Sequence, residues 1–214
     1  AAAGSTSYAL TESGRVLAWG SNVDGSLGSG GALTAAPGIS TCTPATVKLA
    51  SGAELTDVVS LVARAGQRSA VAVALRRDGT VFSWGEGKAA ATPVAGLPAT
   101  VVKVQTEQSG YAALDSDGNV WFWGEALNDS ELGPPAGGPL YSTVATPVKV
   151  SGLPTAVRDL EPGGYADTSI GVRAAAASNG NFRPRIPAMA ADFSGRLWEV
   201  SGPRAREIEP ISPA

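Results

Sequence analysis

Two pairs of acidic residues are the first candidates for catalysis in this 214-residue chain. Asp115 and Asp117 are two positions apart, as are Asp159 and Glu161, so each pair would lie on one face of a strand and could supply a general acid and a base. Each pair is near a turn and has no basic partner, so we interpret both as solvated turn residues. The sequence therefore predicts no enzyme and no catalytic residue.

The residue types that most enzymes and metal sites use are scarce. Histidine is absent and Cys42 is the only cysteine, which excludes Ser-His and Cys-His nucleophile systems, an intrachain disulfide and a cysteine or histidine metal cluster. We expect no metal and no cofactor. The glycine-rich stretch SLGSGG lacks the Lys-Ser/Thr of a phosphate-binding loop. Cys42 is interpreted as a buried, inert thiol, and the alternative is an intermolecular bridge.

A β-hairpin that occurs four times organises the chain, so the sequence indicates a repeat protein. In each copy a Ser-Gly or Asp-Gly pair, which favours the positive φ of a tight turn, separates two apolar runs. After the turn, large residues alternate with mostly smaller ones, which is typical of a sheet covered on both faces, as in a propeller blade. The copies span 9–20, 74–85, 113–124 and 190–201, and their structural positions are Gly14, Trp19, Gly79, Trp84, Gly118, Trp123, Gly195 and Trp198.

The second, third and fourth hairpins each follow a short Pro-led strand and an apolar strand, so each unit has four strands. The predicted fold is all-β, with one repeat domain over 1–214 that forms a β-propeller-like array of about four antiparallel four-stranded blades. We expect the tryptophan of each of the first three hairpins to be buried at an equivalent position. The flanking pairs are Thr43-Pro44 with Val58–Ala63, Thr92-Pro93 with Val101–Val104, and Thr146-Pro147 with Val157–Leu160.

These units resemble the repeats of the regulator of chromosome condensation family, which carry a turn Asp-Gly, a strand ending in Trp-Gly, an Asn-x-x-Gly-x-Leu-Gly connector and a Thr-Pro strand. The fourth copy departs from this pattern at Val200 and Ser201, and Glu86-Gly87-Lys88 has lost the connector motif. The resemblance implies a propeller, typically of seven blades. With about four units, the propeller is incomplete, small, or completed by another chain. The matching residues are Asp78-Gly79, Trp84-Gly85, Asp117-Gly118, Trp123-Gly124, Asp24-Gly25, Leu27-Gly28 and Thr146-Pro147.

The longest departure from the repeat is an insertion at 173–187. We interpret it as a surface loop or an extended hairpin tip. The alternative is a contact loop, because Phe182 lies between Arg183 and Arg185, and interfaces favour aromatic and guanidinium groups. Segment 173–206 is rich in arginine and segment 78–131 is rich in acids, which indicates solvated loop ends or head-to-tail complementarity between copies.

The last hairpin places Glu199 where the other copies have Ala18, Ser83 and Phe122. Burying an unpaired carboxylate is costly, so we expect this face of the last blade to meet water or a basic partner. We also interpret Ala205–Ile211 as a lone outer strand. The sequence therefore predicts that the chain assembles with another chain, through this strand or the N-terminal hairpin.

Charge and composition limit the partners and the location. The net charge of −3 and the lack of a basic stripe argue against nucleic acid, and no apolar run is long enough to span a bilayer. The start at Ala1-Ala2-Ala3-Gly4 and the composition favour an extracellular or cell-surface protein.

The sequence thus favours a secreted or cell-surface, non-catalytic module that binds a protein or copies of itself. The alternative is a structural subunit of a surface assembly or filament whose blades pair across chains. A carbohydrate-active enzyme that uses two carboxylates is the least favoured function.

Overall fold

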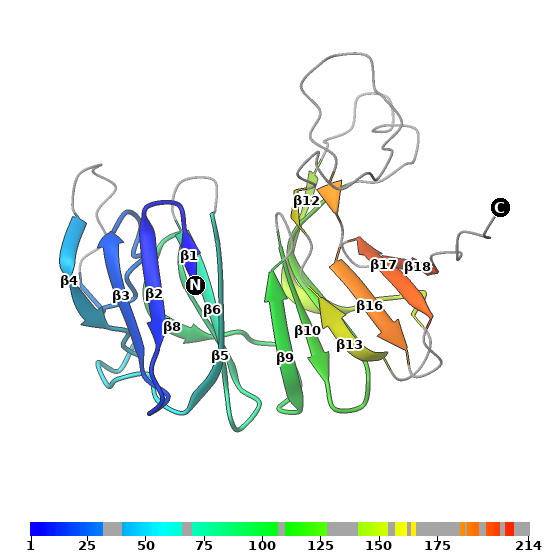
Figure 1. Ribbon diagram of the computed structural model, residues 1–214, viewed down its shortest axis with the longest axis horizontal. Coiled ribbons are helices and arrows are strands. Elements are labelled where there is room, and N and C mark those ends of the chain that lie inside the picture. The colour runs from blue at the N-terminus through cyan, green and yellow to red at the C-terminus, as the bar shows by residue number, and fades with distance from the viewer. Residues whose placement is uncertain are drawn as a thin grey trace, which may run out of the picture. The chain divides into compact units, whose positions relative to one another are not determined.

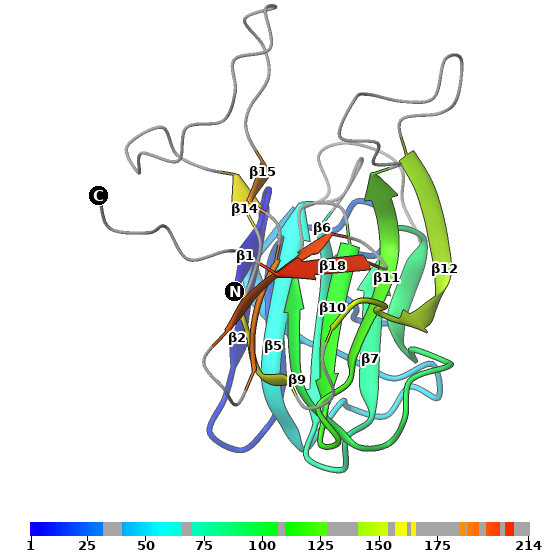
Figure 2. The same cartoon turned by 90° about the vertical axis from the view of Figure 1, so that its right-hand side faces the viewer.

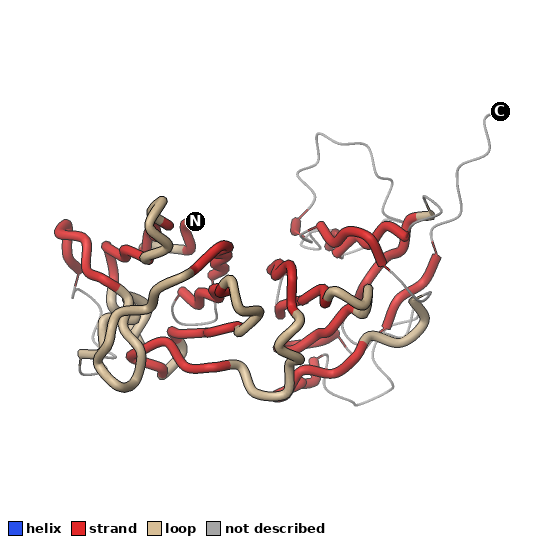
Figure 3. The backbone as a smooth tube through the Cα atoms, turned by 90° about the horizontal axis from the view of Figure 1, so that it is seen from below, coloured by secondary structure: helices blue, strands red, loops and turns tan. Residues whose placement is uncertain are grey.

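The computed structural model describes eleven stretches of the chain. Within them every regular element is a strand (Figure 3). The strands form four four-stranded sheets and one two-stranded ribbon (Figure 1), which confirms the expected all-β array of four-stranded sheets. The described residues are 1–31, 40–65, 70–106, 110–127, 141–153, 157–161, 164–165, 185–186, 188–192, 196–201 and 204–207.

The strands of each sheet follow one another along the chain, and the ribbon of β14 (Gly164–Tyr165) and β15 (Arg185–Ile186) interrupts only the fourth sheet (Figure 2). The first sheet comprises β1 (Ala2–Ala3), β2 (Thr6–Leu10), β3 (Val16–Ser21) and β4 (Ser40–Thr46). The second comprises β5 (Val58–Ala65), β6 (Ala70–Arg76), β7 (Val81–Gly85) and β8 (Lys88–Pro93). The third comprises β9 (Val101–Thr106), β10 (Gly110–Asp115), β11 (Val120–Leu127) and β12 (Tyr141–Lys149). The fourth comprises β13 (Val157–Glu161), β16 (Ala188–Asp192), β17 (Leu197–Ser201) and β18 (Arg204–Glu207).

The chain divides into two compact units. One unit comprises Ala1–Val104 and Ala113–Asp117, and the other comprises Gln105–Ala112 and Gly118–Ala214. The first and second sheets lie wholly in the first unit, and the fourth sheet lies in the second. The third sheet contributes residues to both.

The predicted hairpins form at the Ser-Gly and Asp-Gly pairs. β2 pairs with β3, β6 with β7, and β16 with β17 in antiparallel register, and β10 is the neighbour of β11 in the third sheet. Gly14, Gly79 and Gly118 have φ of 75°, 81° and 79°, so the turns use the left-handed backbone that glycine adopts without strain. Gly195 lies outside the described residues.

The turn glycines also lie against the following sheet. This contact was not predicted from the sequence. Val58 N donates to Gly14 O at 3.0 Å, and Val157 N donates to Gly118 O at 2.9 Å. At Gly79 an added Cβ would collide with the carbonyl oxygen of Ala99. Each turn therefore lies in backbone contact with the segment that begins the next sheet, and a side chain there would separate the two.

The Trp-Gly glycine marks a bulge in the outer hairpin of the first three sheets. Gly20, Gly85 and Gly124 have φ of 101°, 90° and 111°, and the register with the outermost strand shifts just before each of them. Ser201 replaces this glycine in the fourth sheet, and there β17 and β18 pair without a shift. The bulge thus occurs where glycine supplies the positive φ.

The pairing next to the bulge shows that the three Thr-Pro pairs do not all occupy equivalent positions. Ala18 pairs with Ala45, and Phe122 pairs with Val148, so Thr43-Pro44 and Thr146-Pro147 both end one residue before the paired position. Thr92 itself pairs with Ser83. Thr92-Pro93 therefore stands two residues later than the other two pairs, and its likeness to them in sequence is not an equivalence in structure.

The core of the first unit lies between the first and second sheets. The side of β2 and β3 that carries Tyr8 and Ala18 packs against the side of β6 and β7 that carries Ala72 and Trp84. In the second sheet every residue of Ala70–Leu75 and Val81–Gly85 is buried, so this sheet is covered on both faces as expected. In the first sheet burial alternates along β2 and β3, and only one face is fully buried.

Trp19 therefore departs from the expected equivalence. Trp84 has no exposed surface and Trp123 is 7% exposed, whereas Trp19 is only partly buried. Trp84 points from the second sheet toward the first. Trp19 points from the opposite face of the first sheet, where the second sheet cannot cover it. The prediction that all three tryptophans are equally buried is wrong for Trp19.

In the second unit, Trp123 stacks on Tyr111 with ring centroids 5.4 Å apart. Trp198 is 9% exposed and Leu160 is fully buried. The interpretation of the C-terminal segment as a lone strand is wrong for the described residues, because β18 pairs with β17 and completes the fourth sheet. Glu199 pairs in register with Arg206 of β18, and its side chain is not described.

Candidate functional site

The two acidic pairs have different surroundings. Asp115 and Asp117 are at the turn of the third hairpin, whereas Asp159 and Glu161 lie within β13, so the interpretation of both pairs as turn residues is wrong for the second pair. Asp115 is 3% exposed, and its Oδ1 accepts a hydrogen bond from Asp117 N at 3.0 Å. Asp159 Oδ1 accepts from Leu160 N at 2.9 Å. Asp117 is exposed as expected, but Asp115 is buried, which corrects the interpretation of both as solvated. A buried carboxylate that accepts a backbone N–H in a tight turn stabilises the hairpin.

The turn of the fourth hairpin contains a second buried carboxylate. Asp192 is 3% exposed; its Oδ2 accepts from Arg196 Nε at 2.8 Å and its Oδ1 accepts from Arg196 N at 3.0 Å. The Arg196 guanidinium lies 5.5 Å from the centroid of the Trp198 ring. This charge pair closes the hairpin and leaves the carboxylate facing its own turn.

Cys42 is exposed, so the interpretation of a buried thiol is wrong. The residue lies in the bulge of β4, the outermost strand of the first sheet, between the paired positions Thr41 and Ala45. Among the residues that the structure describes, no three His, Cys, Asp or Glu side chains come together as metal ligands would. The described part of the chain also has no helix of the length and hydropathy that crosses a membrane.

The connector after the first hairpin, residues 22–30, forms the best-defined site in the first unit. Asn22 Oδ1 accepts from Leu27 N at 3.1 Å, which closes the turn over Asp24 and Gly25. Tyr8 OH donates to Ser26 O at 2.6 Å and fixes the connector to the face of the first sheet. These bonds give the Asn-x-x-Gly-x-Leu-Gly pattern a structural function.

This connector provides a socket for the tryptophan of the next sheet. The rings of Tyr8 and Trp84 meet edge to face, with centroids 5.9 Å apart and an interplanar angle of 74°. A Cβ on Gly28 would lie 2.6 Å from Cδ1 of Trp84, which is closer than real side chains approach. We call this arrangement, Tyr8 and Gly28 around Trp84, the tryptophan socket. It shows that glycine in the connector leaves room for the indole.

Backbone hydrogen bonds join the same connector, and Lys48 after β4, to the outer hairpin of the second sheet. Gly30 N donates to Ala89 O at 2.9 Å, and Gly87 N donates to Asp24 O at 2.9 Å. Ala91 N donates to Lys48 O at 2.8 Å. The tryptophan socket and this seam bind two consecutive sheets together by side-chain packing at one place and by backbone pairing at the other.

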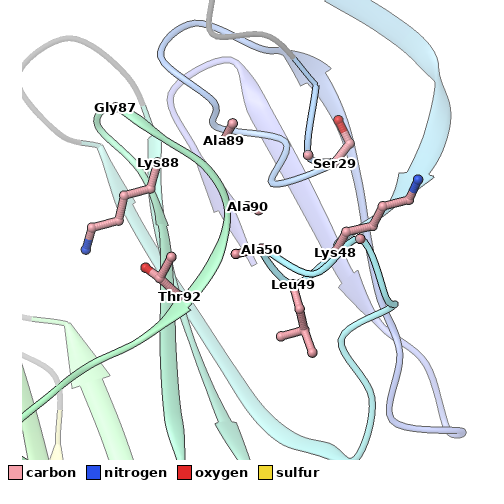
Figure 4. Close-up of a pocket in the computed structure, with 11 residues that line it drawn as sticks. Ser29, Lys48, Leu49, Ala50, Gly87, Lys88, Ala89, Ala90 and Thr92 are labelled. Carbon is pink, nitrogen blue, oxygen red and sulfur yellow. The ribbon is translucent and has the colours of Figure 1, made fainter.

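An open pocket of about 510 Å³ lies along this seam (Figure 4). Its wall consists largely of small residues, and its two lysines extend in opposite directions, away from each other (Figure 4). Lys88 Nζ donates to Ser83 Oγ at 2.9 Å. Catalysis needs polar groups that converge on one point, and these lysines do not. The lining residues include Ser29, Gly30, Lys48, Leu49, Ala50, Lys88, Ala89, Ala90 and Thr92.

The predicted contact loop lies largely outside the described residues. Phe182 and Arg183 lie outside the described residues. Arg185 is in β15, where its backbone pairs with Tyr165, and its side chain is not described. The contact hypothesis for these three residues stays a prediction.

Residues 2–26 match the model of the regulator of chromosome condensation (RCC1) repeat. This range holds β1, the first hairpin and the connector up to Ser26. It includes Tyr8 of the tryptophan socket and ends before Gly28. No curated protein sequence matches the chain.

Several solved structures have a similar fold. Human WBSCR16 is 19% identical with a TM-score of 0.61, and the match covers 96% of this chain and 50% of that one. Yeast RCC1 (Prp20), solved bound to Kap60, is 17% identical with a TM-score of 0.59, covering 96% and 47%. Prp20p from Saccharomyces cerevisiae, described with its binding to Gsp1p and histones, gives 17% identity and a TM-score of 0.51, covering 69% and 36%. The chain thus spans about half the length of the first two.

Proposed function

We propose that this chain, which carries regulator of chromosome condensation repeats on a propeller-type fold, is a non-catalytic module that binds another protein. The observation that carries the proposal is that the characteristic residues of the repeats have structural roles. The turn glycines, Trp84 and the connector serve contacts between sheets, and the buried carboxylates of Asp115 and Asp192 bond to their own turns. Such a scaffold leaves loops and sheet edges free to contact a partner.

The similar structures support a protein ligand. Prp20 was solved bound to Kap60, and its binding to Gsp1p and histones was described with its structure. Fold similarity at this identity does not transfer those partners. It supports only the class of function, in which a propeller of these repeats offers a surface to another protein.

The partner surface that we propose is the insertion at 173–187, with Phe182, Arg183 and Arg185 as its contacts. The test uses the immobilised chain to capture candidates, identifies them by mass spectrometry and measures binding of each purified candidate by calorimetry. We expect saturable binding, and we expect replacement of the three residues by alanine to weaken it at least about tenfold without lowering the melting temperature. The matched control is Arg77→Ala, which removes an exposed arginine from the turn of the second hairpin.

Two outcomes would count against this surface. If the triple variant unfolds, the insertion is structural and does not act as a contact loop. If it binds as the wild type does, the partner uses another surface. The absence of any saturable partner would contradict the binding function itself. The extracellular or cell-surface location is proposed from composition alone, and fractionation of the producing cells with an antibody to the chain tests it.

A structural subunit of a surface assembly is the second candidate. The partly exposed face of the first sheet favours it, because repeat units rely on neighbours to bury their faces. Light scattering on a concentration series separates the two functions, since assembly without any other protein supports the subunit.

A further inference from the structure

The bulge in β8 shapes the pocket along the seam. Between its pairings with Ser83 and Gly85 of β7, the strand has three alanines, residues 89–91, opposite a single residue of β7. The backbone of these alanines bonds instead to the connector, at Gly30, and to Lys48. This part of β8 therefore stands away from its own sheet and forms one wall of the pocket.

The walls of the pocket leave main chain uncovered. Three lining residues are glycines with φ of 79°, 86° and 90°. An added Cβ would meet nothing within 4 Å at two of them and only Lys48, at 3.9 Å, at the third. Ala50 is exposed, and Figure 4 shows it with Ala90 between the two lysines. The middle of the pocket is thus open to a ligand that approaches the backbone closely. The glycines are Gly30, Gly52 and Gly87.

The charges of the pocket are all positive. Its lining contains Lys48 and Lys88 and no acidic residue. Both lysines are exposed, and within the described part of the chain neither forms an ion pair. Lys88 Nζ bonds only to the neutral hydroxyl of Ser83. Asp24 and Glu86, which adjoin the seam near Gly87, are not part of the lining. The pocket therefore favours an anionic ligand.

The direction of the lysines selects the shape of that ligand. They extend away from each other (Figure 4), so a single small anion would contact only one amino group. A ligand that uses both must be elongated and carry negative charge at two places. The volume of about 510 Å³ is within the range of ligand pockets.

We propose that this pocket binds an extended acidic segment of a partner protein. The backbone of the segment lies against the glycine and alanine walls, where small side chains allow the close approach seen when a peptide is added along a strand. One carboxylate of the segment meets Lys48 and another meets Lys88. The inference builds on the proposed protein-binding function and gives it a contact apart from the insertion at 173–187.

The test measures the binding of a fluorescent peptide by anisotropy. The probe alternates glutamate and alanine over about eight residues, so that an extended chain presents carboxylates at regular intervals. The same peptide with glutamine in place of glutamate is the control for charge. We expect saturable binding of the glutamate peptide below about millimolar concentration and no saturable binding of the glutamine peptide.

Three variants locate the site. Lys48→Gln and Lys88→Gln each remove one charge, and glutamine at 88 keeps a donor near Ser83. Each should weaken peptide binding about three- to tenfold, and the double variant at least about tenfold. Ala50→Phe fills the pocket, keeps both lysines and should weaken binding as much as the double variant. The matched control is Lys149→Gln, at an exposed lysine of β12, which should bind the peptide as the wild type does. Far-UV circular dichroism and the melting temperature check that each variant folds.

Several results would overturn the inference. They are no saturable binding of the glutamate peptide, unchanged binding by the double variant, or an equal loss in Lys149→Gln. Equally tight binding of an oligothymidylate of similar charge would show a general site for polyanions. Complete displacement of the peptide by about millimolar inorganic phosphate at constant ionic strength would show a site for a small anion.

The protein-binding function is tested separately, by calorimetry with a captured partner. A partner that binds the wild type and the double variant equally would leave that function standing and overturn this contact. Peptide binding in the absence of any saturable protein partner would instead contradict the proposed function.

Discussion

The first and second sheets are built from the same hairpin, yet they differ in what surrounds the tryptophan. Trp84 is completely buried in the tryptophan socket of the sheet before it, and Trp19 is partly exposed on the face of the first sheet that points away from the second sheet. Both tryptophans follow the same turn at the same spacing. The difference shows that this residue is a contact between sheets and not a core residue of its own hairpin. Its contribution to stability therefore depends on the neighbouring sheet.

The largest expected effect tests this comparison directly. Trp84→Ala should lower the free energy of unfolding by about 3–5 kcal/mol, because it leaves a cavity in the socket. Trp19→Ala should lower it by about 1 kcal/mol in dilute solution, because little buried surface is lost. Urea unfolding of both variants measures the difference. Equal losses would show that the two sites have similar surroundings.

A second pair of variants tests the glycine of the socket. Gly28→Ala should cost about 2–4 kcal/mol, since a Cβ there meets the Trp84 indole and the residue has φ of 64°. Gly30→Ala has a similar φ of 79° but its Cβ would come no closer than 3.9 Å to Lys48, so it should cost only about 1 kcal/mol of backbone strain. Thermal unfolding monitored by circular dichroism compares them. A Gly30→Ala loss as large as that of Gly28→Ala would remove the argument for the socket.

The smallest expected effect concerns the turns of the first and second hairpins. Thr80 N donates to Asp78 Oδ1 at 3.0 Å, and this bond, assisted by Arg76, lowers the pKa of Asp78. A lowered pKa in the folded state stabilises the protein above the unfolded pKa of 3.8, and this stability is lost as pH falls through the folded value. Because the carboxylate is exposed, the effect is small. Asp78→Asn should flatten the fall in melting temperature below about pH 4. The first turn uses the neutral Thr11 Oγ1, which accepts from Arg15 N at 3.0 Å, so Thr11→Ser should leave that pH dependence unchanged.

The repeat pattern predicted the hairpins well because their signals are local. A glycine with positive φ and two alternating runs determine a tight hairpin wherever they occur, as at Gly14 and Gly79. The four-stranded sheets followed from the flanking apolar runs. The fourth copy, with Ser201 in place of glycine, also departs in structure, since its outer hairpin has no bulge.

The errors concern features that depend on other parts of the molecule. Whether Trp19 is buried is decided by a neighbouring sheet, and its own hairpin carries no information about that neighbour. Cys42 was expected to be buried because free cysteine usually is, but it lies in the bulge of an outermost strand and is exposed. The displacement of Thr92-Pro93 could not have been found by counting residues from the turn glycine. Pro44 and Pro147 stand 30 and 29 residues after Gly14 and Gly118 and Pro93 stands 14 after Gly79, but this difference reflects the short connection between β7 and β8. Gly28 could have been assigned only by placing the connector next to Trp84.

The central claim is that Trp84 lies in a socket of the preceding sheet while Trp19 lies on the face of the first sheet that points away from the second sheet. Fluorine NMR of the chain labelled with 5-fluorotryptophan tests it most directly, with each resonance assigned by a single Trp→Phe variant and a soluble paramagnetic agent added in dilute solution. We predict strong broadening of the Trp19 resonance and little broadening of Trp84. Equal broadening of Trp19 and Trp84 in the dilute sample would contradict the account.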